Sequence, residues 1–370
     1  MANDTKERIL IAALEMFSKN GYAGTNLREL AGSLGMGKSS MYRHFESKEA
    51  LWNTLLDRMI AYYGARFDSS EHLPPVPDSL DDLVSMTMRM VDFTVHDEKI
   101  VMTRKVLAIE QFRDERAKQL ATKHFLTGLT QMFTHVFRGM MDKGLLRQDD
   151  PEMLAFAYTT PISALIHLCD REPEKAGEAT SQIEAFSRHF VQTYGKILTV
   201  KEAAYSVLRL LGKGKGGYSY LAERDGQQVV VKQIHHEPCD YYRFGNKLEA
   251  ELRDYARLQQ AGIRIPAMLA ADEAAERIVK EYIEGDTICD FLRSGRSVAP
   301  YLPQVREMAA QAKACGLNID YFPTNFVVQG GRIWYVDYEC NDYMDEWSFE
   351  NWGVKYWSRT PELEEYLKRG

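Results

Sequence analysis

Helical periodicity dominates the first half of the chain. Apolar side chains recur there every three or four positions, which is the repeat of an amphipathic helix. The first such segment runs from Thr5 to Asn20 and is stopped by Gly21. A shorter segment begins at Asn26, which together with Glu29 matches a capping box. The pattern therefore predicts two consecutive helices close to the N-terminus.

A glycine-bounded turn, Gly35 to Gly37, separates this second segment from a third. Met41 and Phe45 share one face of the third segment and are expected to point into a core. The other face carries hydroxyls, a phenol and cations: Lys38, Ser39, Ser40, Tyr42, Arg43 and His44. Two short helices around such a turn form a helix-turn-helix, and this outer face suits the major groove of DNA.

A longer helix is predicted to begin at Ser47, with Lys48 in its first turn. A cation there opposes the helix dipole. A phosphate bound jointly by the helix N-terminus and the Lys48 ammonium would explain its position. A solvated surface lysine is the alternative, and the sequence leaves both open.

Residues 51–198 are expected to be entirely helical apart from a break at Pro74–Pro77. Helices are predicted from Asp78 to about Val95, from Lys118 to Met141, from Pro151 onward, and over a last segment that ends at Ile197. Several of their apolar residues suit either a core or the lining of a ligand pocket: Met86, Met90, Met132 and Phe133.

The uncharged run from Met153 to Cys169 is slightly short for a membrane span and contains Pro161. A buried helix kinked at Pro161 is the favoured interpretation. The charged N-terminus does not resemble a signal peptide, and the five cysteines are scattered singly. We therefore expect a cytoplasmic protein without a membrane anchor. The formal net charge of -7 restricts any DNA contact to a local patch.

Strand patterns replace helical ones after Leu198, which predicts domains at 1–50, 51–198 and 199–370. Ser206 to Leu211 is strand-like, and a hairpin is expected on the Asp225-Gly226 turn. Between them lies a GxGxxG pattern, formed by Gly212, Gly214 and Gly217, which is weak evidence on its own.

Five polar residues of the third domain occupy positions suited to chemistry. Lys232 lies on the second strand of the hairpin, and Glu251 lies on the inward face of the next helix, so we expect them to pair. Asp320, Asn325 and Asp337 flank a second predicted hairpin. Two carboxylates and an amide so placed suit a proton acceptor and a magnesium site.

The segment from Ile9 to Leu51 resembles the DNA-binding domain of the TetR family of repressors. The resemblance is carried by AALEMFSKNGYAGTNLRELAGSLGMGKSSMYRHFESKEAL. It implies a homodimer that binds a double-stranded DNA operator, and a helical domain that dimerises and holds a small-molecule inducer. The residues expected to contact DNA are Arg28, Lys38, Ser39, Ser40, Tyr42, Arg43, His44 and Lys48.

Residues 206–357 resemble the protein-kinase-like fold, which implies ATP and Mg²⁺ as cofactors. On that resemblance the three glycines cover the ATP phosphates, Lys232 contacts them, and Glu251 orients Lys232. The segment IVKEYIEG, which contains Glu281 and Ile283, would receive adenine. Asp320 would be the catalytic base, and Asn325 and Asp337 would hold the metal.

Two departures from the protein-kinase pattern bear on the substrate. Asn318 stands where a histidine is usual, and Asp337 is followed by Tyr338-Glu339 instead of Phe-Gly. That ending is similar to choline kinases and aminoglycoside phosphotransferases. A small hydroxylated substrate, a protein substrate, and nucleotide binding without turnover all stay open.

The sequence thus predicts a multidomain fold, an all-α TetR-like helix-turn-helix and helical bundle followed by an α+β kinase-like domain. The first functional hypothesis is a transcriptional regulator, most simply a repressor. The alternative is an ATP-dependent phosphotransferase for which the helical part supplies dimerisation and DNA tethering.

Overall fold

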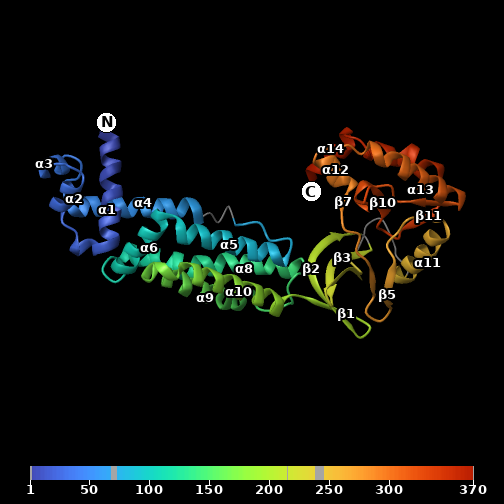
Figure 1. Cartoon of the computed structure of the whole chain (residues 1–370), viewed down its shortest axis with the longest axis horizontal. Coiled ribbons are helices and arrows are strands. Elements are labelled where there is room, and N and C mark those ends of the chain that lie inside the picture. Colours follow the sequence, from blue (N-terminus) through green and yellow to red (C-terminus); the bar gives the residue numbers. More distant parts are fainter. Residues whose placement is uncertain (1, 68–72, 215, 238–245, 370) are drawn as a thin grey trace. The chain divides into compact units, whose positions relative to one another are not determined.

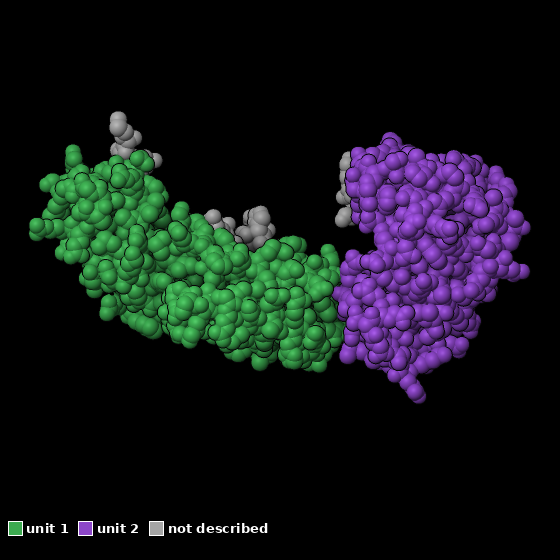
Figure 2. All heavy atoms as spheres, in the orientation of Figure 1, with its two compact units in different colours: residues 1–196 green, residues 197–370 purple. Residues whose placement is uncertain are grey.

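The computed structural model describes residues 2–67, 73–214, 216–237 and 246–369. The chain divides into two compact units, residues 1–196 and residues 197–370 (Figures 1 and 2). The second unit begins two residues before the boundary predicted from the sequence. The reason is local, because Ile197 and Leu198 belong to its first strand instead of the last helix of unit 1.

Four helices surround one hydrophobic core at the N-terminal end of unit 1. The backbone leaves helical geometry at Gly21, where φ is 69°, at the predicted stop. Asn26 caps the second helix, because its side-chain oxygen accepts a hydrogen bond from the Arg28 amide at 2.8 Å. The helices are α1 (Ala2–Gly24), α2 (Leu27–Ser33), α3 (Lys38–Tyr42) and α4 (Lys48–Phe67).

The predicted helix-turn-helix is formed by α2 and α3. Gly35 sits in the turn with φ of 66°, a left-handed conformation that favours glycine. Met41 and Phe45 are buried in the shared core, as their spacing predicted. With these two side chains inward, the polar face of α3 is turned to solvent.

The remainder of unit 1 is a bundle of helices, as the sequence predicted. Pro151 opens one of them at its first position, and the Asp150 carboxylate caps the same helix through the amides of Glu152 and Met153. The helices are α5 (Leu80–His96), α6 (Glu98–Glu110), α7 (Glu115–Thr122), α8 (Gly128–Asp142), α9 (Pro151–Arg171) and α10 (Ala176–Tyr194).

Three expectations for this bundle are corrected by the structure. The helix α6 lies in the region expected to be helical, but no separate helix was assigned to it. The segment expected as one helix from Lys118 is two helices joined by a π-helical turn, Lys123–Thr127. The last helix ends at Tyr194 because Ile197 pairs with Ser206 in a sheet.

Aromatic side chains fill the interior of the bundle. Tyr158 is fully buried, donates a hydrogen bond to the Ser187 hydroxyl at 2.9 Å, and lies 2.9 Å from the Thr87 hydroxyl. Phe133 packs against its ring with centroids 5.0 Å apart. Phe133 is therefore a core residue, while Met86, Met90 and Met132 are half-buried.

A buried ion pair links α6 and α9. Arg104 binds the Asp170 carboxylate through two nitrogens, at 2.5 and 2.7 Å, and a third nitrogen donates to the Thr94 carbonyl at 3.0 Å. The Arg104 side chain is only 3% exposed. This bidentate geometry pairs the Arg104 guanidinium with the Asp170 carboxylate, so neither charge is buried without a partner.

The helix predicted around Pro161 is α9, and it is buried on one face only. Tyr158 and Ile162 face the core, whereas Met153 and Phe156 are more than half exposed. Within the part of the chain that the structure describes, no helix has both the length and the apolar character that a membrane crossing requires.

Unit 2 begins with a curled antiparallel sheet in the order β1-β2-β3-β4-β6-β5 (Figure 1). The hairpin β3–β4 turns at Asp225 and Gly226, both with positive φ, as the Asp-Gly pair predicted. The predicted strand from Ser206 is the middle of a longer β2. The strands are β1 (Ile197–Val200), β2 (Ala203–Lys213), β3 (Gly217–Arg224), β4 (Gln227–Ile234), β5 (Met268–Asp272) and β6 (Arg277–Glu281).

The helix α11 (Lys247–Gln260) follows β4, and a mostly helical part follows β6. The core of the part that follows β6 contains Trp357, whose indole N–H donates to the Tyr321 carbonyl at 2.8 Å. The predicted second hairpin is β9–β10. The elements are β7 (Asp286–Thr287), α12 (Ile288–Arg293), α13 (Leu302–Ala314), β8 (Leu317–Ile319), β9 (Phe326–Gln329), β10 (Arg332–Tyr335), β11 (Cys340–Asp342) and α14 (Pro361–Arg369). This mixture of sheet and helices is compatible with the expected α+β class.

Candidate functional site

The first candidate site is the solvent-facing side of the helix-turn-helix. The helix α3 has five residues, and the chain after it closes in a turn in which the His44 amide donates to the Met41 carbonyl at 3.0 Å. None of the residues predicted to contact DNA is buried. They are Arg28, Lys38, Ser39, Ser40, Tyr42, Arg43, His44 and Lys48.

Contacts among these side chains are few and exposed. The Lys38 ammonium lies 5.7 Å from the centre of the Tyr42 ring, and Tyr42 is 41% exposed. One Arg43 nitrogen donates to the Ser40 hydroxyl at 3.3 Å. Such exposed contacts are worth little, so these groups can exchange them for phosphate or base contacts at small cost.

Lys48 differs from Lys38 and Arg43 because its partners lie on α1, outside the set of residues predicted to contact DNA. Its ammonium lies 4.4 Å from the centre of the Tyr22 ring and 3.5 Å from the Ala23 carbonyl oxygen. Ser47 caps α4 as predicted, by accepting the Ala50 amide at 3.0 Å. The sequence suggested either a phosphate ligand or a fully solvated lysine, and neither interpretation included this contact with Tyr22.

The helix α1 contributes to the same surface, which the sequence did not predict. Thr5 and Arg8 line a cavity of about 570 Å³ together with Ser40, Arg43 and His44. The cavity brings a further guanidinium next to the polar side of α3. In the sequence, only the position of Arg8 on the polar face of α1 could have indicated that α1 contributes to this surface.

The second candidate site lies in unit 2 around Lys232, and we call it the lysine–carboxylate cluster. Lys232 on β4 forms an ion pair with Glu251 on α11, as predicted, and its ammonium is 3.5 Å from an Asp337 oxygen. The side chains of Lys232 and Glu251 are 12% and 14% exposed. Residues from three separate stretches therefore meet in one partly buried place.

The charges of this cluster support one another. Burial alone would lower the pKa of Lys232, but the carboxylates of Asp337 and Glu251 outweigh it and raise that pKa above its ordinary value. Burial alone would raise the pKa of Asp337, but Lys232 and Lys280 lower it. The cluster therefore favours a charged ammonium on Lys232 beside an ionised carboxylate on Asp337.

Lys280 is a second cation of this region that sequence analysis missed. Its ammonium donates to the Val336 carbonyl at 2.5 Å and lies 4.8 Å from the centre of the Tyr338 ring. Burial and the nearby Lys232 lower its pKa to about 8. The available signal was a lysine directly after the apolar pair Ile278-Val279 of β6.

The glycine-rich stretch between β2 and β3 passes close to the cluster. A Cβ placed on Gly216 would lie 3.4 Å from a Glu251 oxygen and 3.7 Å from the Lys232 nitrogen. A Cβ on Gly217 would lie 2.4 Å from the Gln233 carbonyl oxygen, so only glycine fits there. Of the three predicted glycines, Gly217 has a steric reason, whereas Gly212 and Gly214 have open space.

Asp320 and Asn325 are joined at the base of the hairpin β9–β10 by a side-chain-to-backbone hydrogen bond. The Asn325 side-chain amide donates to the Asp320 carbonyl at 3.4 Å, and the Val336 amide donates to the Asn325 carbonyl at 2.9 Å. The Asp320 carboxylate accepts the Phe322 amide at 3.1 Å. The fold thus brings Asn325 next to the strand end that leads to Asp337.

Glu281 and Ile283 lie where β6 ends. The Glu281 amide donates to the Ala267 carbonyl at 2.8 Å, and its carboxylate accepts the Ala267 amide at 3.2 Å. Ile283 is buried, with 3% of its surface exposed. The Glu281 side chain therefore has a structural task at this strand end.

The described residues of the cluster offer carboxylate oxygens but no complete set of protein ligands for a metal ion. No group of three or more His, Cys, Asp or Glu side chains among the described residues could hold a metal ion. Mg²⁺ needs only one or two protein carboxylates when phosphates supply other ligands. Among the described residues, the buried Glu251 Oε2 atom has no hydrogen-bond partner, which leaves an unused acceptor in the cluster.

Comparison with known proteins identifies the first site. Residues 9–55 match the model of the bacterial regulatory proteins of the tetR family. An uncharacterised HTH-type transcriptional regulator of Bacillus subtilis, YerO, is 37% identical over 71 residues, which are 19% of this chain and 24% of that protein. This match thus spans about a quarter of that relative's length.

Longer but more distant similarities cover the rest of unit 1. The IcaR protein of Staphylococcus epidermidis, a negative transcriptional regulator of the biofilm operon icaADBC, is 24% identical over 160 residues, 35% of this chain and 86% of that protein. SmeT, the repressor of a Stenotrophomonas maltophilia multidrug efflux pump, aligns with 52% of this chain and 90% of its own, at 21% identity and a TM-score of 0.38. On the family match and the geometry of α2 and α3, residues 9–55 are a helix-turn-helix domain of the TetR family.

Proposed function

We propose that this protein is a transcriptional regulator that binds a DNA operator through the outer face of α3. The observation that carries this proposal is the placement of cations and hydroxyls around α3, opposite the buried Met41, within a TetR-family domain. Lys38 and Arg43 are exposed there, so they can reach phosphates or base edges.

We propose a homodimer as the DNA-binding form. A single α3 of five residues reaches too few base pairs to select one site in a genome. Two copies on one face of the duplex, a helical turn or more apart, solve this problem and require a near-palindromic operator. Sedimentation at micromolar concentration is expected to give a dimer mass, and a monomer mass would contradict the proposal.

We propose repression as the mode of regulation and a small-molecule inducer as the signal. The relative IcaR is named as a negative regulator, and this gives repression its support. A nuclease footprint on the DNA upstream of the protein's own gene tests the regulator directly. The footprint should be lost with Tyr42→Ala and weakened with Lys48→Ala, and its persistence in both variants would contradict DNA contact by this face.

A second function, binding of ATP with Mg²⁺ by a kinase-like unit 2, is favoured by the lysine–carboxylate cluster. Lys232 and Glu251 pair beside a glycine-rich turn, and Asp337 is close to the same ammonium. In this proposal Lys232 contacts phosphate oxygens, Glu251 orients Lys232, and Asn325 and Asp337 hold the metal. The bound magnesium would supply charge neutralisation between the phosphates.

Asp320 would accept the proton of a substrate hydroxyl in a phosphotransferase reaction. Its position is fixed by the Phe322 amide, which donates to its carboxylate at 3.1 Å, and by its own backbone amide, which donates to the Tyr335 hydroxyl oxygen at 3.2 Å. ATP consumption should disappear with Asp337→Ala. Absence of ATP–magnesium binding at millimolar nucleotide would contradict both the cofactor and the enzymatic function.

A further inference from the structure

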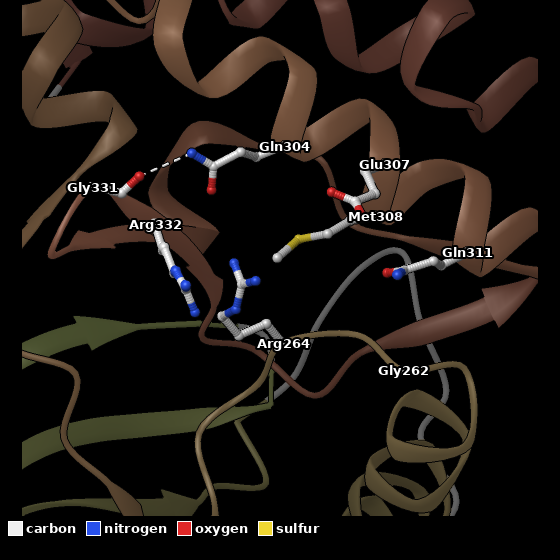
Figure 3. A pocket seen from close by; sticks show the side chains of 8 residues that line it. All are labelled: Gly262, Arg264, Gln304, Glu307, Met308, Gln311, Gly331 and Arg332. Carbon is white, nitrogen blue, oxygen red and sulfur yellow. Dashed lines mark hydrogen bonds between the residues drawn. The ribbon is translucent and has the colours of Figure 1, made fainter.

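A polar cavity of about 500 Å³ lies in unit 2 between α13, the start of β10 and the chain after α11 (Figure 3). None of its lining residues belongs to the lysine–carboxylate cluster. Its volume is in the range of small-molecule sites, but its walls are mainly polar. The side chains that define it are Arg264, Gln304, Glu307, Met308, Gln311 and Arg332.

Arg264 forms the floor of this cavity and is held in place by β10. One of its guanidinium nitrogens donates to the Ile333 carbonyl at 3.1 Å, and its own carbonyl accepts the Tyr335 amide at 2.9 Å. The side chain is half-buried. Figure 3 shows its guanidinium in the middle of the cavity, so its other N–H groups remain directed at the space.

Arg332 enters the same cavity from a turn that is tied to α13. The Gln304 side chain donates to the Gly331 carbonyl at 2.9 Å and accepts the Ile333 amide at 3.0 Å. The backbone on both sides of Arg332 is thereby fixed. Its exposed guanidinium has no ion pair or hydrogen bond within the part of the chain that the structure describes.

The cavity therefore concentrates positive charge in a chain whose formal net charge is -7. Two guanidinium groups face one carboxylate, Glu307, which lies on α13 and points toward the cavity in Figure 3. Guanidinium groups match phosphoryl and carboxylate oxygens in charge and geometry, and an anion between them would remove their mutual repulsion. Glu307 can accept a hydrogen bond from a hydroxyl or ammonium of the same ligand.

We propose that this Arg264–Arg332 cavity binds a small organic oxyanion that also carries a hydrogen-bond donor. The phosphoryl or carboxylate group lies between the two guanidinium groups, and the donor group lies against Glu307. The site is separate from both functions proposed above, so its occupancy can be tested without DNA or ATP.

Calorimetric titration of the full chain at constant ionic strength tests the site with three probes: inorganic phosphate, glycerol 3-phosphate and citrate. Binding of glycerol 3-phosphate or citrate is expected, and it should weaken by about tenfold with Arg332→Ala, which removes one charge-assisted contact. Arg209→Ala, a change of an exposed arginine on β2, is the matched control and should leave binding unchanged. The preferred probe distinguishes a phosphoryl ligand from a carboxylate ligand.

Two further variants locate the bound anion. Glu307→Gln should strengthen the binding of inorganic phosphate. Relative to inorganic phosphate, this variant should bind glycerol 3-phosphate more weakly than the wild type does, because glutamine is a weaker acceptor than a carboxylate for the hydroxyl group of the ligand. Arg264→Ala should weaken binding as Arg332→Ala does. Binding of every probe that is unchanged in both arginine variants would overturn the proposal, as would no heat from any probe at millimolar concentration.

Discussion

At the scale of single residues, Lys232 is the group on which the proposed nucleotide binding by unit 2 depends. It lies between the Glu251 and Asp337 carboxylates, and all three are largely shielded from water. Removing one partner of such a group leaves the others as uncompensated buried charges, which costs more than the pair itself contributes. The same arrangement that suits a phosphate contact therefore also determines stability.

The first prediction concerns the buried charges that are left without a partner when Lys232 is replaced. Lys232→Met should lower the free energy of unfolding by about 3 kcal/mol, because Glu251 and Asp337 lose their counter-charge. The double variant Lys232→Met/Glu251→Gln should recover about 1 kcal/mol or more of that loss. Urea denaturation measures both.

The matched control is the exposed pair Lys19–Glu15, whose side chains are 66% and 57% exposed. Lys19→Met should change the free energy of unfolding by less than about 0.5 kcal/mol. A double variant less stable than Lys232→Met alone would refute the charge argument.

Buried tyrosines are expected to make the stability of the folded protein fall at alkaline pH. Burial raises the pKa of Tyr63 in unit 1 and of Tyr321 in unit 2, each to about 12. Below pH 10 both states of the protein keep these protons, so there is no effect. Between pH 10 and 12 the unfolded chain releases the proton and the folded chain keeps it, so stability falls.

The second prediction is that each tyrosine contributes a fall of about 1.4 kcal/mol per pH unit in that window. Urea denaturation at pH 9, 10 and 11, with tyrosinate absorbance recorded in parallel, measures it. Tyr321→Phe should make the decline of unit 2 shallower. An unchanged slope in this variant would show that Tyr321 ionises normally in the folded protein.

At the scale of elements, the turn between β2 and β3 shows that the glycines of one motif have different tasks. Gly217 touches the backbone of β4, where a Cβ would lie 2.4 Å from the Gln233 carbonyl oxygen. Gly214 has open space, and the nearest atom to its Cβ would be 4.0 Å away. The pattern GxGxxG alone could not separate these roles.

The third prediction follows from this contrast. Gly217→Ala should force β3 and β4 apart and lower the free energy of unfolding by about 2 kcal/mol. Gly214→Ala, in the same loop, should change it by no more than about 0.5 kcal/mol. Equal destabilisation by both variants would contradict the steric account.

Elements with strong local signals were predictable from the sequence. The Asp225-Gly226 hairpin, the Asn26 and Ser47 caps, and the proline start of α9 each depend on a few adjacent residues. The bounds of α6 were not assigned within the region expected to be helical, because its buried residues include Arg104 and Glu110, whose partners lie on other helices. A polar residue that is buried by a distant partner breaks the periodicity on which such predictions rest.

At the scale of the whole molecule, the change from helical to strand periodicity near residue 198 lies close to the boundary between the two units, whereas the predicted domains 1–50 and 51–198 fall within one compact unit. The Lys232–Glu251 pair was also predictable, because an inward carboxylate requires a nearby cation. The contact of Lys48 with Tyr22, the second cation Lys280 and the Arg264–Arg332 cavity were not. Each of them joins segments that no local pattern connects.

The central claim is that the exposed face of α3 binds DNA, and equilibrium binding to the DNA upstream of the protein's own gene tests it most directly. Fluorescence anisotropy at several salt concentrations should give a steep salt dependence for the wild type. Arg43→Ala should weaken binding about tenfold or more and reduce the salt slope, while Arg209→Ala should behave as wild type. Equal affinity and equal salt slope for Arg43→Ala, Tyr42→Ala and the wild type would contradict the account.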